Sequence, residues 1–150
     1  MDLVEVVRGA ERDLERVIAV RRLALSVEVD GDPVVVHGDA AHLEAVVTNL
    51  LTNAIKFTED GGWVRCTLRA VSGTARLSVS DNGLGIPEAE QGDLFTRFFR
   101  SSTAREHAIQ GTGLGLTIVD SIVRSHGGDI AVTSKHLGGS TFSVCLPLAR

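Results

Sequence analysis

The sequence contains few cysteines, no basic stripe and no long apolar run. Cys66 and Cys145 are its only cysteines, and they form no CxxC pair. Both fall in strand-like runs, which predicts reduced, buried thiols rather than a disulfide or a metal site. No apolar stretch approaches the roughly 18 residues of a membrane-spanning helix, and the N-terminus has no signal-peptide pattern. We therefore expect a soluble chain that makes no direct membrane contact.

The bulk composition is that of a globular protein. The 150 residues are 43% hydrophobic and 23% charged, and the formal net charge is −4. A chain of this length can form one ordinary domain, which we expect over residues 1–150. An acidic chain without a basic stripe also argues against nucleic acid as the main partner.

The spacing of apolar residues predicts both helices and strands. Helical spacing indicates helices over 3–20, 40–57 and 113–126, and Asp39 is the expected N-cap of the second. Pro87 suits the first turn of a short helix over 87–95. Alternation indicates strands over 23–29, 34–37, 63–71, 75–81, 127–134 and 140–147. The pattern predicts an α/β (α+β) two-layer sandwich, with a mixed, largely antiparallel sheet of about five strands covered on one face by about three helices.

Three glycines, Gly111, Gly113 and Gly115, precede the third predicted helix. A dinucleotide-binding fingerprint needs glycine at position 116, where Leu116 stands, and no Walker A pattern occurs. Bare backbone at a helix N-terminus lets a phosphate approach the unpaired N–H groups. A flexible hinge is the other interpretation of these glycines.

Two asparagines and a lysine share one face of the second predicted helix. Asn49, Asn53 and Lys56 are spaced i, i+4 and i+7. An amide oxygen is a hard ligand that suits Mg²⁺, and a lysine one turn away can meet phosphate charge. A solvated polar face would show the same spacing.

A carboxylate stands at the end of the strand predicted over 75–81. Asp81 has the phase of the apolar residues before it, and it is followed by Gly83 and Gly85. A buried carboxylate needs donors, and the exocyclic amine of adenine is one. An aspartate that caps its own turn would also fit Asp-Asn-Gly.

Together these motifs resemble the ATP-binding domain of sensor histidine kinases. "NLLTNAIKFT" resembles the N box, "DNGLG" the G1 box, "FTRFF" the F box and "GTGLGL" the G2 box, and "GGSTFSVCLP" resembles the last hairpin of that family. The resemblance implies that Asn53 is the Mg²⁺ ligand, that Lys56 contacts a phosphate and that Asp81 recognises adenine by a hydrogen bond. Where many relatives have glycine this chain has Leu137, which we expect to affect only a turn. The ATP site implied by the family comprises Asn49, Asn53, Lys56, Asp81, Gly83, Gly85, Ile86, Gly111, Thr112, Gly113, Leu114, Gly115, Leu116, Ser140 and Thr141.

The resemblance also implies a lid over the nucleotide, residues 100–112, a polar segment without periodicity. Phe95, Phe98 and Phe99 would anchor one end of the lid. Arg100 or Arg105 would approach the phosphates when the lid orders.

The expected reaction is transfer of the γ-phosphate of Mg-ATP to a histidine. Asn49 stands where the related ATPases carry a water-activating glutamate, and an amide cannot act as a general base. None of the five histidines (His37, His42, His107, His126 and His136) is followed by glutamate, as an acceptor histidine would be. We therefore expect the cytoplasmic catalytic half of a membrane-anchored sensor kinase, acting with a histidine-bearing dimerisation domain and a response regulator. The alternatives are an anti-sigma-type serine kinase and a non-catalytic nucleotide-sensing module.

Overall fold

The computed structural model describes residues 1–29, 33–106 and 114–149, which form five strands and five helices. In chain order the elements are α1 (Leu3–Val20), β1 (Ala24–Val29), α2 (Ala40–Phe57), β2 (Trp63–Val71), β3 (Thr74–Asp81), α3 (Glu88–Gln91), α4 (Ser102–Glu106), α5 (Gly115–Ser125), β4 (Asp129–Ser134) and β5 (Ser140–Pro147).

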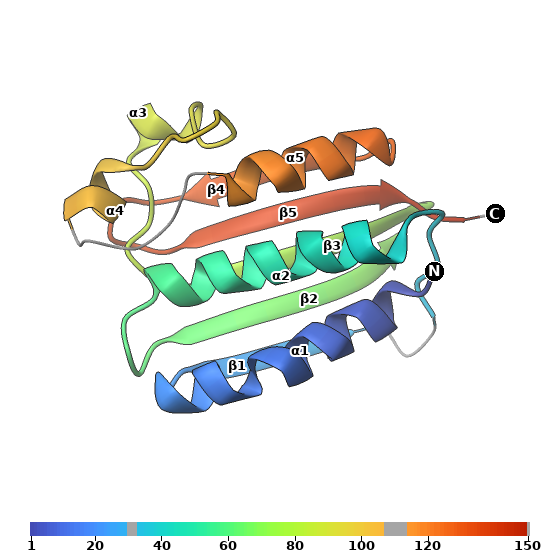
Figure 1. Ribbon diagram of the computed structural model, residues 1–150, viewed down its shortest axis with the longest axis horizontal. Coiled ribbons are helices and arrows are strands. Elements are labelled where there is room, and N and C mark those ends of the chain that lie inside the picture. Colours follow the sequence, from blue (N-terminus) through green and yellow to red (C-terminus); the bar gives the residue numbers. More distant parts are fainter. Residues whose placement is uncertain (30–32, 107–113, 150) are drawn as a thin grey trace.

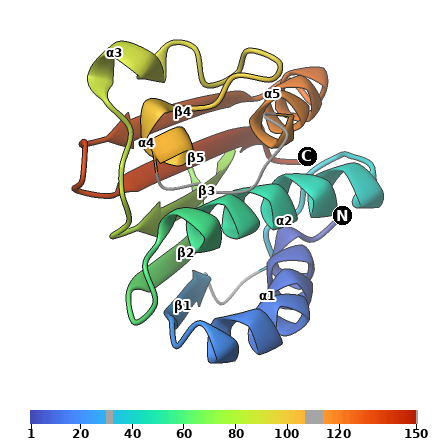
Figure 2. The same cartoon turned by 60° about the vertical axis from the view of Figure 1, so that its left-hand side comes forward.

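The strands form one mixed sheet in the order β1-β2-β3-β5-β4. β1 and β2 run parallel, and the other three neighbouring pairs are antiparallel. Helices α1, α2 and α5 lie side by side across one face of the sheet, with α2 in the middle (Figures 1 and 2). The expected two-layer sandwich is therefore confirmed.

The core lies between these two layers, and strand alternation selects the side chains that enter it. In β3 every second residue from Ala75 to Asp81 is buried, and the residues between them are more exposed. The first half of α1 and most of the apolar face of α2 meet this surface. Burial of apolar area on this scale is the main stabilising contribution to such a fold.

Both long helices begin at an aspartate N-cap. Asp2 Oδ1 accepts the backbone N–H of Val4 at 3.0 Å, and Asp39 Oδ1 accepts that of His42 at 3.0 Å. Each cap satisfies a donor that the helix itself leaves unpaired. Asp39 is thus the N-cap that its position predicted.

Residues 34–37 do not form the predicted strand. The segment makes single bridges only, from Val35 to Asp2 and from Val36 to Leu148. It lies between the two terminal segments and divides its backbone hydrogen bonds between them: Leu3 and Ala149 N–H donate to the carbonyls of Val34 and Val35, and Val36 N–H donates to that of Met1. The alternation was nevertheless informative, because Val34 and Val36 are buried and Val35 is exposed.

Three further expectations need correction. The helix predicted over 87–95 is limited to the four residues of α3 and is followed by turns. The segment 100–112, polar and without periodicity in sequence, is partly helical in its described part: it contains α4, and both Ala104 and the preceding Ser101 are buried. Cys66 is buried as expected, whereas Cys145 is only partly buried, because β5 turns it away from the helices. Among the described residues, no helix has the length and apolarity to cross a membrane.

Candidate functional site

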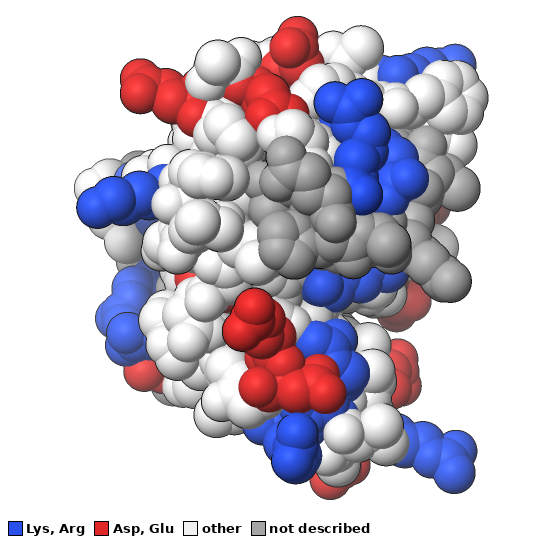
Figure 3. Space-filling model, turned by 90° about the vertical axis from the view of Figure 1, so that its left-hand side faces the viewer, with Lys and Arg blue, Asp and Glu red and all other residues white. Residues whose placement is uncertain are grey.

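A cavity of about 340 Å³ opens between α2, α5, the end of β3 and the α4 segment. This volume falls in the range of small-molecule sites. Lys, Arg, Asp and Glu side chains are interspersed on the end of the molecule where α3 and α4 lie (Figure 3). The lining residues are Asn49, Thr52, Asn53, Lys56, Phe57, Asp81, Ile86, Leu94, Phe99, Arg100, Ser101, Ala104, Leu114, Gly115, Leu116, Ile118, Ser140 and Phe142.

Asp81 forms the carboxylate end of the cavity. It is the last residue of β3, only 7% exposed, and its Oδ1 accepts the backbone N–H of Gly83 at 2.9 Å. Burial raises the pKa of the carboxyl above its usual value, while hydrogen bonds from the backbone of Gly83 and Ser140 oppose that shift. The two interpretations of Asp81, a cap of its own turn and a carboxylate of a ligand pocket, are therefore compatible. Asp81 caps its turn and also lines the cavity.

The loop after Asp81 is held close to its surroundings by two glycines. A Cβ at Gly83 would lie 2.2 Å from the carbonyl oxygen of Phe57, and one at Gly85 would lie 1.9 Å from that of Lys135. Gly85 also has φ +67°, a conformation that L side chains rarely adopt. Neither glycine lines the cavity, but their tight packing places Ile86 in its wall.

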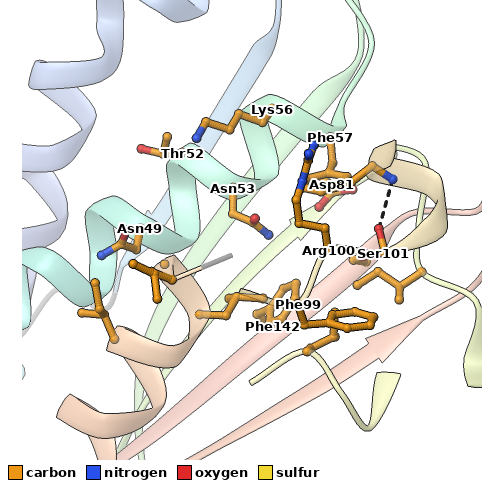
Figure 4. A pocket seen from close by; sticks show the side chains of 18 residues that line it. Asn49, Thr52, Asn53, Lys56, Phe57, Asp81, Phe99, Arg100, Ser101 and Phe142 are labelled. Carbon is orange, nitrogen blue, oxygen red and sulfur yellow. Dashed lines mark hydrogen bonds between the residues drawn. The ribbon is translucent and has the colours of Figure 1, made fainter. Parts of the chain in front are cut away.

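One face of α2 supplies the polar wall. Asn49, Thr52, Asn53 and Lys56 all line the cavity, as positions i, i+3, i+4 and i+7 of a helix should. Figure 4 shows Asn49 and Asp81 at opposite ends of the labelled group, with Asn53 between them. Asn49 Nδ2 donates to the carbonyl of Ala45 at 2.8 Å, so its oxygen is turned toward the cavity.

The first turn of α5 closes the end of the cavity at which the Asn49 amide lies, called the amide end below. Leu114, Gly115 and Leu116 line the cavity, and a Cβ at Gly115 would lie 3.3 Å from Asn49 Oδ1. Leu114, the N-cap residue, makes no side-chain cap. A helix N-terminus of this kind presents backbone N–H groups and a partial positive charge. The expected site residues Gly111, Thr112 and Gly113 lie outside the described residues.

The segment before and within α4 forms the remaining wall. Phe99, Arg100, Ser101 and Ala104 line the cavity. The backbone N–H of Ala104 donates to Ser101 Oγ at 3.1 Å (dashed in Figure 4). This turn is fastened to α3 by Glu90, whose two carboxylate oxygens accept the N–H and the hydroxyl of Ser102, each at 2.6 Å.

Several expected residues do not reach the cavity. Thr141 points to the opposite face of the sheet from Ser140, where its hydroxyl pairs with that of Ser80 at 2.9 Å. Phe98 is 69% exposed and does not join the expected aromatic anchor, since its φ of +63° turns it outward. Phe95 packs against the core instead, and Arg105 is exposed near Glu90.

The sequence reasoning also missed residues that line the cavity. Thr52 could have been found, because it shares the helical face of Asn49 and Asn53. Phe142 could have been found from strand alternation, which puts it on the side of Ser140. No local pattern identifies Leu94 or Ala104, which the α3–α4 segment brings to the wall.

Comparison with known proteins places this geometry in a family. Residues 38–150 match the profile of the histidine kinase-, DNA gyrase B- and HSP90-like ATPases. The signal transduction histidine-protein kinase/phosphatase MprB of Mycobacterium avium (strain 104) is 43% identical over 152 residues, which cover 98% of this chain and 28% of that protein. The chain thus spans little more than a quarter of that relative's length.

Two solved structures extend the comparison. A mycobacterial sensor histidine kinase MprB structure superposes with a TM-score of 0.86 and 36% identity, and the match covers 99% of this chain and 97% of that one. A structure of histidine kinase ThkA in complex with the response regulator protein TrrA matches with a TM-score of 0.82 and 27% identity, covering 99% of this chain and 41% of that one.

Proposed function

Because this chain belongs to the family of histidine kinase-, DNA gyrase B- and HSP90-like ATPases, we propose that it binds Mg-ATP in the cavity and donates the γ-phosphoryl group. The acceptor would be a histidine on a separate dimerisation domain, and a response-regulator aspartate would receive the group next. In that setting the chain is the cytoplasmic catalytic part of a membrane-anchored sensor kinase. The names of its relatives support this assignment.

The observation that carries the proposal is the chemical difference between the two ends of the cavity. The buried carboxylate of Asp81 lies at one end, the amide of Asn49 lies beside the α5 N-terminus at the other, and Asn53 lies between them. A nucleotide has two complementary ends, with hydrogen-bond donors on its base and negative charge on its phosphates.

At the base end, Asp81 retains lone pairs for a ligand. Backbone N–H groups of Gly83 and Ser140 take up part of its accepting capacity, and a carboxylate offers about four lone-pair sites. The exocyclic amine of adenine would donate to the others. Ile86 and Phe142 supply apolar wall against which the ring would pack.

At the phosphate end, the side chains fit a magnesium ion. The amide nitrogen of Asn49 is engaged by Ala45, which leaves its oxygen facing Gly115, and amide oxygens are among the hard ligands of Mg²⁺. Asn53 would hold the ion, which neutralises phosphate charge when bound. Lys56 and Arg100 would add positive charge beside the phosphates, and the N–H groups of the α5 first turn would bind their oxygens.

The same residues favour transfer over hydrolysis. Asp81 is the one carboxylate among the described residues that line the cavity, and it lies at the base end. Asn49 at the phosphate end cannot accept a proton from water. Positioning and charge neutralisation would then do most of the catalysis, with the acceptor supplied from outside.

The test combines binding with transfer. Calorimetry should show Mg-ATP binding to the chain. With radiolabelled ATP, the chain alone should not become labelled, and it should not release phosphate at an appreciable rate. Addition of the histidine-bearing domain of the full-length protein should produce acid-labile phosphate on that domain. Acid-labile phosphate on the isolated chain, or rapid hydrolysis, would contradict the proposal.

A further inference from the structure

Behind the carboxylate end of the cavity, Ser134 joins three segments of the chain. Its hydroxyl accepts the backbone N–H of Ile86 at 2.8 Å, donates to the carbonyl of Gly139 at 3.1 Å and lies 2.7 Å from Ser140 Oγ. Ser140 lines the cavity and pairs with Asp81 across β3 and β5. Ser134 is not itself part of the lining, so it can influence a ligand only through these neighbours.

Either oxygen can be the donor in the hydrogen bond between Ser134 and Ser140, and the other partners of Ser134 bear on its direction. A serine hydroxyl donates one hydrogen bond and can accept two. The Gly139 carbonyl can only accept, and the Ile86 N–H can only donate. With the single Ser134 proton assigned to Gly139, the second acceptor position of Ser134 takes the proton of Ser140 Oγ. Ser140 then presents lone pairs to the cavity beside the Asp81 carboxylate.

We infer that Ser134 is a positioning residue for base specificity, acting by orienting the Ser140 hydroxyl. This inference rests on the proposed function, since it requires a purine at the Asp81 end. Two neighbouring acceptors favour a purine with an amino group at position 6. They disfavour one with a carbonyl oxygen there, because facing acceptors leave buried polar groups without a partner.

A second residue fixes the same loop without touching either hydroxyl. Gln91 Nε2 donates to the carbonyls of Ile86 and Ser134, each at 3.0 Å. Gln91 thus positions the wall of the cavity, whereas Ser134 also sets the direction of a proton. The two roles can be separated, because loss of Gln91 should affect all purines equally.

The experiment measures selectivity between two bases. The chain is titrated by calorimetry with Mg-ATP, with Mg-ITP, which has a 6-oxo base, and with magnesium tripolyphosphate. In Ser134→Ala the freed Ser140 hydroxyl can turn its proton to the carbonyl of ITP, so the ATP/ITP affinity ratio should fall about tenfold, the value of one hydrogen bond. Tripolyphosphate affinity should not change. Gln91→Met should weaken both nucleotides and keep their ratio.

Two further variants complete the test. Ser140→Ala should lower the ratio by itself, and the Ser134→Ala/Ser140→Ala double variant should go no lower, because Ser134 acts only through Ser140. Ser143→Ala is the matched control, since this β5 hydroxyl bonds to Ser78 on the opposite face at 3.2 Å; it should change nothing.

The outcomes distinguish the inference from the proposed function. An unchanged ATP/ITP ratio in Ser134→Ala, or additive losses in the double variant, would overturn the role of Ser134 while ATP binding stands. A wild-type chain that binds ATP no better than tripolyphosphate would overturn the proposed function and the inference with it.

Discussion

Replacing Gly115 by alanine should separate nucleotide binding from folding. Gly115 is the first residue of α5 and lines the cavity. An added Cβ would lie 3.3 Å from Asn49 Oδ1 and 3.9 Å from Asn49 Cγ, so the amide needs to give way by only a few tenths of an ångström. Alanine is also the better helix former, by up to about 1 kcal/mol. We therefore expect the free energy of unfolding to stay the same or rise slightly.

Binding should respond in the opposite direction. The methyl group would be added in the wall of the cavity beside Asn49, on the helix turn whose backbone N–H groups are proposed to bind the phosphate oxygens. Loss of one hydrogen bond to a charged group costs about 1.5–3 kcal/mol. With about 1.4 kcal/mol for each factor of ten, the dissociation constant of Mg-ATP should rise about 10- to 150-fold.

Thermal unfolding without ligand and calorimetry with Mg-ATP measure the two effects separately. Gly92→Ala is the matched control, because a Cβ at Gly92 meets no atom within 4 Å and the residue lies outside the cavity lining. The reasoning is refuted if Gly115→Ala binds Mg-ATP within about twofold of wild type. It is refuted equally if weaker binding is accompanied by a matching loss of stability, since the glycine would then serve the turn alone.

Three other changes test the remaining assignments. Asp81→Asn should weaken Mg-ATP binding about 10- to 150-fold and leave the affinity for tripolyphosphate unchanged. Equal losses of affinity for both ligands in calorimetry would show that Asp81 does not recognise the base. Burial raises the pKa of Asp81 above 3.8, and the base amine needs the ionised carboxylate. Acidification through that raised pKa should therefore weaken ATP relative to tripolyphosphate, and Asp81→Asn should abolish this dependence. Asn53→Ala should remove the Mg²⁺-dependent part of binding, and an equal loss in EDTA would contradict a metal role. Hydrogen bonds from Ser102 lower the pKa of Glu90 below 4.5, so its stabilisation of α4 is present above 4.5 and is lost as the pH falls through the lowered value. Glu90→Gln should accordingly speed amide exchange over 102–106 at neutral pH, and unchanged exchange would show that Glu90 does not hold α4.

The long helices were predictable because their determinants are local. The sequence predicts helices over 3–20 and 40–57, and the structure has the same bounds. An aspartate that caps the first turn and apolar residues at helical spacing act within a few residues of each other. Asp81 was predictable for the same reason, because strand alternation alone puts it on the side of Leu77 and Val79.

The expectations that failed depend on contacts between distant segments. Phe95, Phe98 and Phe99 have helical spacing, but no helix forms there and Phe98 is turned outward. The alternation of Phe142, Val144 and Leu146 already indicated that Ser140 rather than Thr141 faces the cavity, so the sequence could have decided between the two serine and threonine candidates. The role of Ser134 was not accessible from the sequence, because its partner Ile86 is 48 residues away.

The two ends of the cavity are built in different ways, and this has a consequence for stability. At the amide end the side chains come from one turn of α5 and one face of α2, two helices that pack against each other. At the carboxylate end, Asp81, Ser134 and Ser140 are brought together only when β3, β5 and β4 have paired. Polar groups that are buried there must satisfy one another, since an unpartnered group costs about 1–3 kcal/mol. Substitutions at the carboxylate end should therefore couple nucleotide selectivity to folding, whereas Gly115 and Asn53 can be changed with little effect on the unliganded fold.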